Sequence, residues 1–311
     1  MKILSLNGGG SLGYITISIL EHLEQNIDKQ CYELFDIISG VSTGSIIGYA
    51  LSCGIPASVI KENYKKFIPE IFGNKRGFIR SFFGSLYKSE NLENVIKDYF
   101  GDRKINETKT KFMTYACRLN DPATRPEFWK SWKESGDIEA YKAICASCSA
   151  PLYFDPYNID GSYFTDGGIV SNSCNIASIV EARKLGITTD EIKMVNFGFL
   201  TYNNFDKKDL LGLIRVASNV TGMSVGGTEY MEEHQTKTML PPGQFLGCFP
   251  ECYGLAMDTI DFSRMDNIVS EFIFANASLL NNFLTVTTQV HRAIETGSSP
   301  SISSTNQVGV F

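Results

Sequence analysis

Residues 35–48, FDIISGVSTGSIIG, decide the fold of this chain. The short run at 35–38, rich in apolar and β-branched residues, predicts a buried strand, and residues 45–51 predict a buried helix. Between them lies Gly40-Val41-Ser42-Thr43-Gly44, a G-x-S-x-G pattern. A strand-to-helix turn of this kind holds its serine in a strained conformation and lifts the hydroxyl clear of the sheet. Ser42 is therefore a candidate nucleophile.

The glycines on either side of Ser42 fit this interpretation. Gly40 and Gly44 lack the side chains that would collide at so sharp a turn. The free N–H groups at the start of the following helix favour negative charge that develops beside Ser42. The pentapeptide alone is common, but the flanking strand and helix are the context that the motif requires.

The composition is that of an ordinary globular enzyme. The chain has 311 residues, of which 43% are hydrophobic and 20% charged, and its net charge is −6. Binding to nucleic acid needs a basic surface, so we expect no nucleic-acid partner. The acidic balance gives no help towards anionic membranes either, so any contact with lipid must be local and largely apolar.

No targeting or metal-binding signal stands out. The first residues reach a glycine run too early for a signal peptide, and no stretch approaches the roughly 18 apolar residues of a membrane span. We expect a cytoplasmic protein, with signal-less export left open. The eight cysteines are typical of a reducing compartment. Cys145-x-x-Cys148 lacks a second pair at zinc-finger spacing, and the chain has three histidines, so we expect no metal and no cofactor.

The order of elements predicts an α/β fold with a mostly parallel central sheet. A strand at 3–6, a helix over 15–23 and the strand and helix of 35–51 give a β-α-β-α start, which implies parallel strands. The rest of the chain adds strands at 112–119, 127–132, 162–165 and 192–199, and helices at 56–68, 89–100, 139–149, 175–185, 208–220, 224–238 and 266–283.

The chain reads as a single domain over residues 1–296. Its part from 207 to 296 is mostly helical, and the Ser-rich tail, 297–311, is expected to be disordered. Residues 72–88 are basic, aromatic and interrupted by glycines, which predicts a loop. That loop is either a packed surface excursion or a lid that touches lipid.

A second glycine run follows the first predicted strand. Gly8-Gly9-Gly10-Ser11-Leu12-Gly13 fits G-x-G-x-x-G, so a dinucleotide site is a rival interpretation. That fingerprint requires an acidic residue at the end of the second strand to bind the ribose. Here the acidic residue, Asp36, lies at the start of that strand, so the dinucleotide interpretation fails this test. The alternative is a loop whose backbone N–H groups, at Gly8, Gly9 and Gly10, bind an oxyanion beside Ser42.

A nucleophilic serine also needs a base. Ser42, Asp166 and either His234 or His291 follow the Ser–acid–His order of α/β-hydrolases. However, His234 lies in a charged helical segment, and His291 lies close to the tail. The serine also follows the second strand, earlier than in those hydrolases. A direct Ser42–Asp166 pair fits better, because an apolar pocket would raise the low pKa of an aspartate.

Together these residues carry a resemblance to a known family. The glycine run ending at Gly13, the elbow Gly40–Gly44 and Asp166-Gly167-Gly168 resemble the three signatures of patatin-like phospholipases. Residues 145–154, CASCSAPLYF, resemble the segment that precedes the Asp-Gly-Gly in that family, which makes Cys145 and Cys148 members of a structural helix. The resemblance covers about residues 1–200.

The resemblance implies a three-layer α/β/α fold and a lipid acyl hydrolase, most simply a phospholipase A, acting on membrane phospholipid through transient contact with the membrane surface. It implies a catalytic pair of Ser42 and Asp166 and an oxyanion hole from Gly8, Gly9 and Gly10. The glycines of the same motifs, Gly13, Gly40, Gly44, Gly167 and Gly168, would support these residues. The reaction that the resemblance implies requires no metal.

The chain departs from the family pattern in three places. Leu12 stands where the family usually has Arg or Lys, Asn7 where it often has Asp, and Asn172-Ser173-Cys174 where it has Asn-Asn-Pro. These departures leave head-group preference open and motivate an alternative, a non-catalytic or weakly active scaffold that binds lipid or protein. A Ser-Asp-His esterase is a further alternative, and a nucleotide-binding enzyme ranks third.

Overall fold

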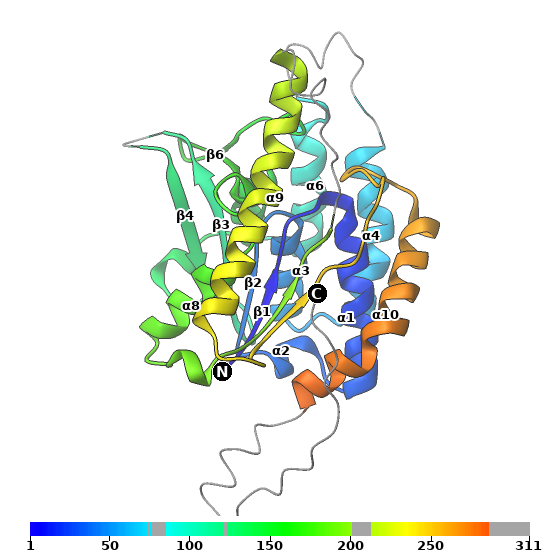
Figure 1. Cartoon of the computed structure of the whole chain (residues 1–311). Coiled ribbons are helices and arrows are strands. Elements are labelled where there is room, and N and C mark those ends of the chain that lie inside the picture. Colours follow the sequence, from blue (N-terminus) through cyan, green and yellow to red (C-terminus); the bar gives the residue numbers. More distant parts are fainter. Residues whose placement is uncertain (74, 76–84, 121–122, 201–212, 286–311) are drawn as a thin grey trace, which may run out of the picture.

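The computed structural model describes residues 1–73, 75, 85–120, 123–200 and 213–285. Within them the chain forms three layers, helices on both faces of an eight-stranded sheet (Figure 1). This is the α/β fold with a mixed, mostly parallel sheet that the order of elements predicts. The predicted loop at 72–88 lies largely outside the described residues, and the tail from 297 lies entirely outside them.

The sheet has the strand order β5-β6-β3-β2-β1-β7-β8, and β4, which lies off this path, also pairs with β3. The core strands β3, β2, β1, β7 and β8 run parallel, and β4, β5 and β6 add antiparallel pairs at one side. The strands are β1 (Lys2–Leu6), β2 (Ile37–Gly40), β3 (Lys111–Arg118), β4 (Arg125–Lys130), β5 (Tyr157–Ile159), β6 (Ser162–Asp166), β7 (Lys193–Phe197) and β8 (Phe245–Cys248).

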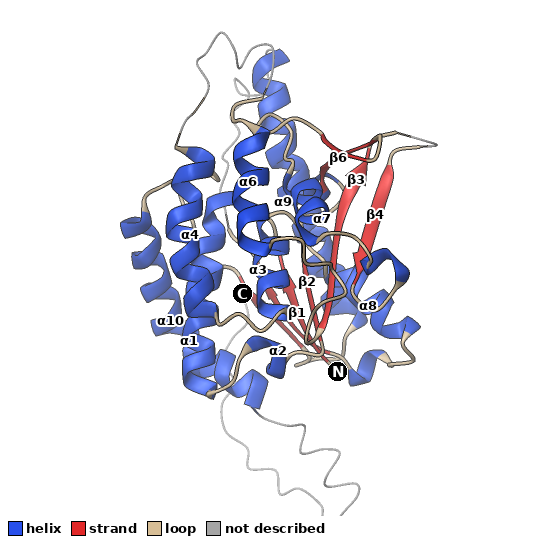
Figure 2. Cartoon of the chain, turned by 180° about the vertical axis from the view of Figure 1, so that it is seen from behind, coloured by secondary structure: helices blue, strands red, loops and turns tan. Residues whose placement is uncertain are grey.

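The helices divide between the two faces of the sheet. Figure 2 shows α1, α3, α4, α6 and α7 in front of the strands, and Figure 1 shows α8 and α9 on the opposite face. Helix α10 packs along α1. The helices are α1 (Gly13–Ile27), α2 (Cys31–Leu34), α3 (Thr43–Ser52), α4 (Ala57–Phe72), α6 (Ser89–Phe100), α7 (Ala140–Cys148), α8 (Asn175–Lys184), α9 (Leu213–Met239) and α10 (Phe262–Thr285).

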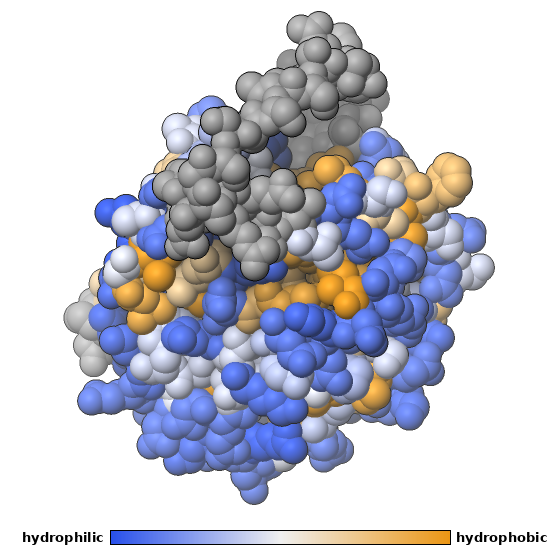
Figure 3. All heavy atoms as spheres, turned by 90° about the horizontal axis from the view of Figure 1, so that it is seen from below, coloured by the Kyte–Doolittle hydropathy of each residue, from blue (hydrophilic) through white to orange (hydrophobic). Residues whose placement is uncertain are grey.

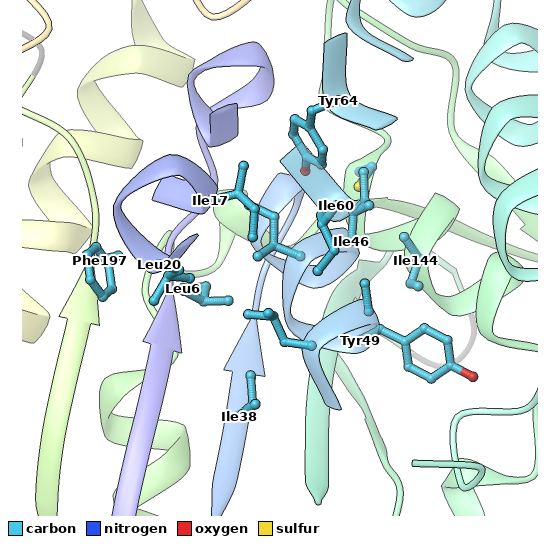
Figure 4. Packing of buried hydrophobic residues seen from close by; sticks show 14 of the residues in the cluster. Leu6, Ile17, Leu20, Ile38, Ile46, Tyr49, Ile60, Tyr64, Ile144 and Phe197 are labelled. Carbon is cyan, nitrogen blue, oxygen red and sulfur yellow. The ribbon is translucent and has the colours of Figure 1, made fainter. Parts of the chain in front are cut away.

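Alternation along the strands builds a separate core on each face. Leu4 is paired in register with Ile38 of β2 and Val195 of β7, and the large cluster under α1, α3 and α4 includes all three. Figure 4 shows Ile38 within this cluster. Ile3 is paired with Ile37, and both join the smaller cluster that α8 covers. A β-strand sends successive side chains to opposite faces, so two buried faces require the near-continuous apolar runs seen here.

The described elements match most of the predicted ones, with differences in the C-terminal part. The predicted helices 208–220 and 224–238 form one helix, α9, in the part of the chain that is described. The mostly helical pattern expected after 207 is also interrupted by β8, which pairs in parallel with β7. Its four residues are too few for a periodic signal, and the pairing with β7 supplies what local propensity does not. The short elements β5 and α2 were likewise not predicted.

Figure 3 views the molecule from the end at which β1 and β2 begin, and hydrophilic residues cover most of the surface drawn in colour there. No helix among the described residues combines the length and hydropathy needed to cross a bilayer.

The close approach of α3 to β1 gives a test of the fold. A methyl group on Gly44 would collide with the Leu6 carbonyl oxygen, which belongs to the backbone and has little room to shift. Gly44→Ala should therefore lower the free energy of unfolding by about 1–3 kcal/mol, measured by urea denaturation. Gly226→Ala is the matched control, since its methyl group meets no atom within 4 Å in helix α9. That change should leave stability equal or raise it by about 0.5–1 kcal/mol. Equal losses in both variants would contradict the packing argument.

Candidate active site

Ser42 occupies the sharp turn between β2 and α3. Its backbone has φ 53° and ψ −130°, a conformation that non-glycine residues adopt only where the surrounding structure imposes it. The flanking glycines show what imposes it. A methyl group on Gly40 would collide with the carbonyl oxygen of Gly44, and one on Gly44 would collide with that of Leu6. The backbone segments are thus in direct contact, and the turn is possible only with glycine at both positions.

The backbone polar groups of Ser42 are held by two helices. Its N–H donates to Ser147 Oγ of α7 at 3.0 Å, and its carbonyl accepts from Ser45 Oγ of α3 at 2.6 Å. Thr114 Oγ1 of β3 donates to the same Ser147 oxygen at 3.3 Å. The backbone N–H and carbonyl of Ser42 are therefore both occupied by hydrogen bonds within the protein.

Asp166 ends β6 and lies beside Ser42. Its carboxylate is buried, at 5% exposure, and Oδ1 accepts from the Gly168 N–H at 2.7 Å. Burial raises the pKa of Asp166 from 3.8 to about 6, while hydrogen bonding with the Ser42 hydroxyl and the Gly168 amide acts in the opposite direction. The carboxyl group is therefore mostly ionised at neutral pH, yet it is a far better base than an exposed aspartate.

The two glycines after Asp166 permit close packing. A methyl group on Gly167 would lie 2.5 Å from the Tyr115 carbonyl oxygen of β3, and one on Gly168 would lie 2.8 Å from Asn172 Oδ1. Asp166 donates its own N–H to the Ser149 carbonyl oxygen at 3.0 Å. The Asp-Gly-Gly turn is thus pressed between β3 and the following loop.

The first glycine run lies beside the serine. A methyl group on Gly8 would approach Ser42 Cβ to 2.9 Å, and one on Gly9 would approach the Phe199 ring to 2.5 Å. Within the described residues, none of the N–H groups of Gly8, Gly9 and Gly10 donates a hydrogen bond to the rest of the chain. Free amides this close to Ser42 are what an oxyanion hole requires. We call residues 7–11 the oxyanion loop.

Met257, which the sequence analysis did not single out, contacts the end of this loop. Gly10 has φ +58°, and a methyl group there would collide with the Met257 carbonyl oxygen. The same carbonyl accepts the N–H of Ser11 at 2.8 Å. Met257 therefore fixes the last part of the oxyanion loop, although 246 positions separate it from Ser11 (|11 − 257|). Nothing in the local pattern around Met257 indicates this contact.

Position 12, where the patatin-like pattern usually has a basic residue, is occupied here by leucine. Leu12 is fully buried and belongs to the large hydrophobic cluster. Next to it, Gly13 begins α1, where a methyl group would lie 2.6 Å from Thr43 Oγ1. The Leu12 side chain therefore serves the packing of α1 and supplies no charge to the oxyanion loop.

A pocket of about 1010 Å³, including its open mouth, adjoins these residues and is lined by Ser42, Asp166, Gly9 and Gly10. Among the described residues that line it, Asp166 is the only one with a charged side chain. Its remaining walls are mostly apolar side chains of α4 and α6, among them Tyr64, Ile68, Ile71, Leu92, Val95 and Ile96.

The candidate histidines are not brought to this pocket. His234 is exposed on α9, and neither it nor His22 lines the pocket. His291 lies outside the described residues. Geometry in the described part of the chain therefore gives no support to a triad through His234.

The cysteines form no bonded or metal-binding group in the described structure. Cys145 and Cys148 are buried free thiols within α7, as the resemblance implies. Burial raises the pKa of both thiols, so both remain protonated at neutral pH. Among the described residues, no three His, Cys, Asp or Glu side chains are grouped closely enough to hold a metal ion.

Comparisons with known proteins show which family the chain resembles. The model of the family described as patatin-like phospholipase matches residues 4–177. The cGAMP-activated phospholipase of Vibrio cholerae is 30% identical over 231 residues, covering 64% of this chain and 64% of that protein. The human calcium-independent phospholipase A2-gamma is 25% identical over 293 residues, covering 87% of this chain and 37% of that protein.

The chain thus spans less than two thirds of the length of both relatives. Among solved structures, VipD from Legionella pneumophila aligns with a TM-score of 0.45 and 10% identity, covering 87% of this chain and 67% of that one.

The raised pKa of Asp166 predicts how stability depends on pH. Because the folded state holds this proton more tightly than the unfolded chain, the contribution of Asp166 to stability is lost as the pH rises through about 4 to 6. Asp166→Asn has no proton to lose. Its stability relative to the wild type should therefore increase by about 2–3 kcal/mol between pH 4 and pH 8, measured by urea denaturation at each pH. Asp102→Asn, at an exposed site, controls for loss of a surface carboxylate. A pH-independent difference for Asp166→Asn would contradict the prediction.

Proposed function

Because the chain belongs to the patatin-like phospholipase family, we propose that it is a lipid acyl hydrolase of the phospholipase A type. Its substrates are fatty-acyl esters of membrane glycerophospholipids, which it meets in transient contact with the membrane surface. Ser42 is the nucleophile, Asp166 its base, and the amides of Gly8, Gly9 and Gly10 the oxyanion hole. One observation carries the proposal: a strained serine and a buried aspartate, which has no ion pair among the described residues, line the same apolar pocket.

The first half of the reaction forms an acyl-enzyme. Ser42 Oγ attacks the ester carbonyl carbon while its proton passes to the Asp166 carboxylate. The carbonyl electron pair moves onto oxygen, and the amides of the oxyanion loop stabilise that charge. A donor of this kind contributes about 2.7–4 kcal/mol to transition-state stabilisation. As the tetrahedral intermediate collapses, the lysophospholipid oxygen leaves and takes the proton from Asp166.

The second half releases the fatty acid. A water molecule gives a proton to the Asp166 carboxylate and attacks the acyl carbonyl carbon. The oxyanion forms again at the glycine loop, and its collapse breaks the bond to Ser42 Oγ, which regains the proton from Asp166. A pKa near 6 suits this exchange, because a catalytic base works best when its pKa lies close to the ambient pH.

The shape and polarity of the pocket support a long acyl chain as the part of the substrate that it binds. Its walls on α4 and α6 are apolar or aromatic, and each methylene buried there contributes about 0.8 kcal/mol. No lysine or arginine is among its described lining residues, so this part of the protein offers the phosphate no ionic partner. The pocket therefore favours recognition of the acyl chain over recognition of the head group.

The non-catalytic scaffold remains the second candidate, and it rests on the departures from the family pattern. Leu12 is accommodated in the core, and Cys174 is buried at the N-terminus of α8, where it replaces the family's proline. Neither change removes Ser42, Asp166 or a glycine of the oxyanion loop. A fluorophosphonate probe separates the two functions, since only an activated serine reacts with it.

Removal of either proposed catalytic side chain should abolish the activity. We expect Ser42→Ala to lose fluorophosphonate labelling and phospholipid hydrolysis completely. Asp166→Asn should lower kcat by about 10³-fold or more, because an amide cannot accept the serine proton. Hydrolysis of a phosphatidylcholine vesicle, followed by fatty-acid release, measures both.

His234→Ala and His291→Ala are the matched controls, and each should retain most of the activity. Folding of every variant is checked by circular dichroism. Activity lost in a folded histidine variant would overturn the Ser–Asp assignment in favour of a triad. A folded wild type that neither labels nor hydrolyses would favour the scaffold.

The acyl-binding role of the pocket predicts a change in chain-length preference. Val95 of α6 is buried in the pocket wall, so Val95→Phe fills part of the space that a long chain needs. The ratio of kcat/KM for palmitoyl over butyryl p-nitrophenyl esters should fall about tenfold or more, corresponding to two or so displaced methylenes. Val95→Ala, which enlarges the pocket, is the control and should not lower that ratio. An unchanged ratio in Val95→Phe would place the acyl chain elsewhere.

A further inference from the structure

A third carboxylate lies close to the oxyanion loop and has no part in the chemistry described above. Glu229 of α9 is partly buried, and its Oε1 accepts hydrogen bonds from Asn172 Nδ2 at 2.7 Å and from Asn7 Nδ2 at 3.0 Å. In the described part of the chain it forms no ion pair. Two side-chain amides, one from the oxyanion loop and one from the loop after Asp166, therefore converge on a single carboxylate oxygen.

Asn172 connects this carboxylate to the backbone of the oxyanion loop. Its Nδ2 group has two hydrogens, and besides Glu229 it donates to the Gly8 carbonyl oxygen at 3.0 Å. A trans peptide group is planar, so the carbonyl of Gly8 and the N–H of Gly9 point in opposite directions. Holding the Gly8 carbonyl towards Asn172 turns the Gly9 N–H away from it. Glycine offers little steric resistance to a flip of this peptide, so its orientation depends on such contacts.

The orientation of Asn7 is fixed in the same way. Asn7 Oδ1 accepts from Asn196 Nδ2 at 2.7 Å, which leaves Asn7 Nδ2 to face Glu229. The Asn7 N–H also donates to the Phe197 carbonyl oxygen of β7 at 2.8 Å. Both amides thus present donors, and a carboxylate, which only accepts, satisfies both without ambiguity.

The neighbouring turn of α9 shows that this contact is specific to Glu229. Glu232 accepts from Ser171 Oγ at 2.8 Å and from the Ile176 N–H at 3.1 Å, so it anchors α9 to the loop after Asp166. Among the hydrogen bonds of the described residues, none joins Glu232 to the oxyanion loop. Glu233, the next residue along α9, forms an ion pair with Lys237 at 2.7 Å.

We propose that Glu229 is a positioning residue for the oxyanion loop: it orients Asn172, whose amide holds the Gly8 carbonyl and so directs the Gly9 N–H towards the ester oxygen. This role rests on the proposed hydrolase function. Burial raises the pKa of Glu229 to about 7, and the hydrogen bonds from Asn172 and Asn7 act against that shift. A carboxylate that is largely shielded from solvent, with no cationic partner among the described residues, is costly, and side chains of that kind cluster at functional sites.

The test measures kcat and KM for phospholipid hydrolysis in Glu229→Ala, Asn172→Ala and the double variant. Loss of an ordered oxyanion donor affects the transition state, so kcat should fall about 10- to 100-fold with KM changed less than threefold. Because Glu229 acts through Asn172, the double variant should be no slower than Asn172→Ala. Glu229→Gln keeps an oxygen acceptor and should recover most of the rate. Glu233→Gln is the surface control and should match the wild type.

A second readout separates this inference from the proposed function. Hydrogen exchange of the Ser11 and Leu12 amides, which donate to Met257 and Gly9, reports order in the loop without any substrate. Exchange should be faster in Glu229→Ala and Asn172→Ala and unchanged in Glu233→Gln. An inactive wild type with this exchange pattern refutes the hydrolase and leaves the positioning intact. Unchanged exchange, an unaffected kcat in Glu229→Ala, or rate losses that multiply in the double variant would overturn the positioning role.

Discussion

The structure of the site depends on one constraint, the direct contact of backbone with backbone where α3 begins against β1 and β2. Gly40 meets the carbonyl of Gly44, and Gly44 meets the carbonyl of Leu6. With no side chain between these segments, the chain can leave β2 and enter α3 only by placing Ser42 at a positive φ. The same contact sets the distance from Ser42 to the end of β1, and therefore to the oxyanion loop that follows it. Loss of either glycine would displace both parts together.

The features that sequence reasoning predicted are those whose physical cause is local. A β-branched run before a G-x-S-x-G predicts a strand followed by a sharp turn. A glycine run directly after a strand predicts a loop. Both predictions need only a few neighbouring residues. Asp166 was predicted from its Asp-Gly-Gly turn and from the resemblance to a family. Its position beside Ser42 follows from the pairing of β6 with β3, which itself lies next to β2.

The rest of the site could not be predicted from the sequence. Its residues are far from Ser42 in the chain, and they act through hydrogen bonds that many residues of the same type could form. Ser147 accepts the Ser42 N–H from 105 positions away, and Asn7 donates to Glu229 from 222 positions away. A serine in a helix or a glutamate on a polar helix face carries no sign of such a partner. Met257 holds the loop through its carbonyl oxygen, a group that every residue has, so its residue type does not indicate the contact. Strand β8 is similar, since its four residues become a strand by pairing with β7.

The absence of a cation from the described lining of the pocket changes how negative charge must be handled there. An oxyanion that forms near an ionised Asp166 would be repelled by it, at an effective energy of a few kcal/mol for charges about 4 Å apart. In the proposed reaction that repulsion does not arise, because the proton of Ser42 neutralises Asp166 in the same step that creates the oxyanion. The negative charge is transferred from the Asp166 carboxylate to the ester oxygen, so the pocket never contains the ionised carboxylate and the oxyanion at the same time. Glu229 is kept apart from this exchange by the amide of Asn172, which donates to Glu229 on one side and to the Gly8 carbonyl on the other. In the proposed arrangement the neutral amide of Asn172 therefore orients the Gly8 carbonyl without adding charge to the pocket.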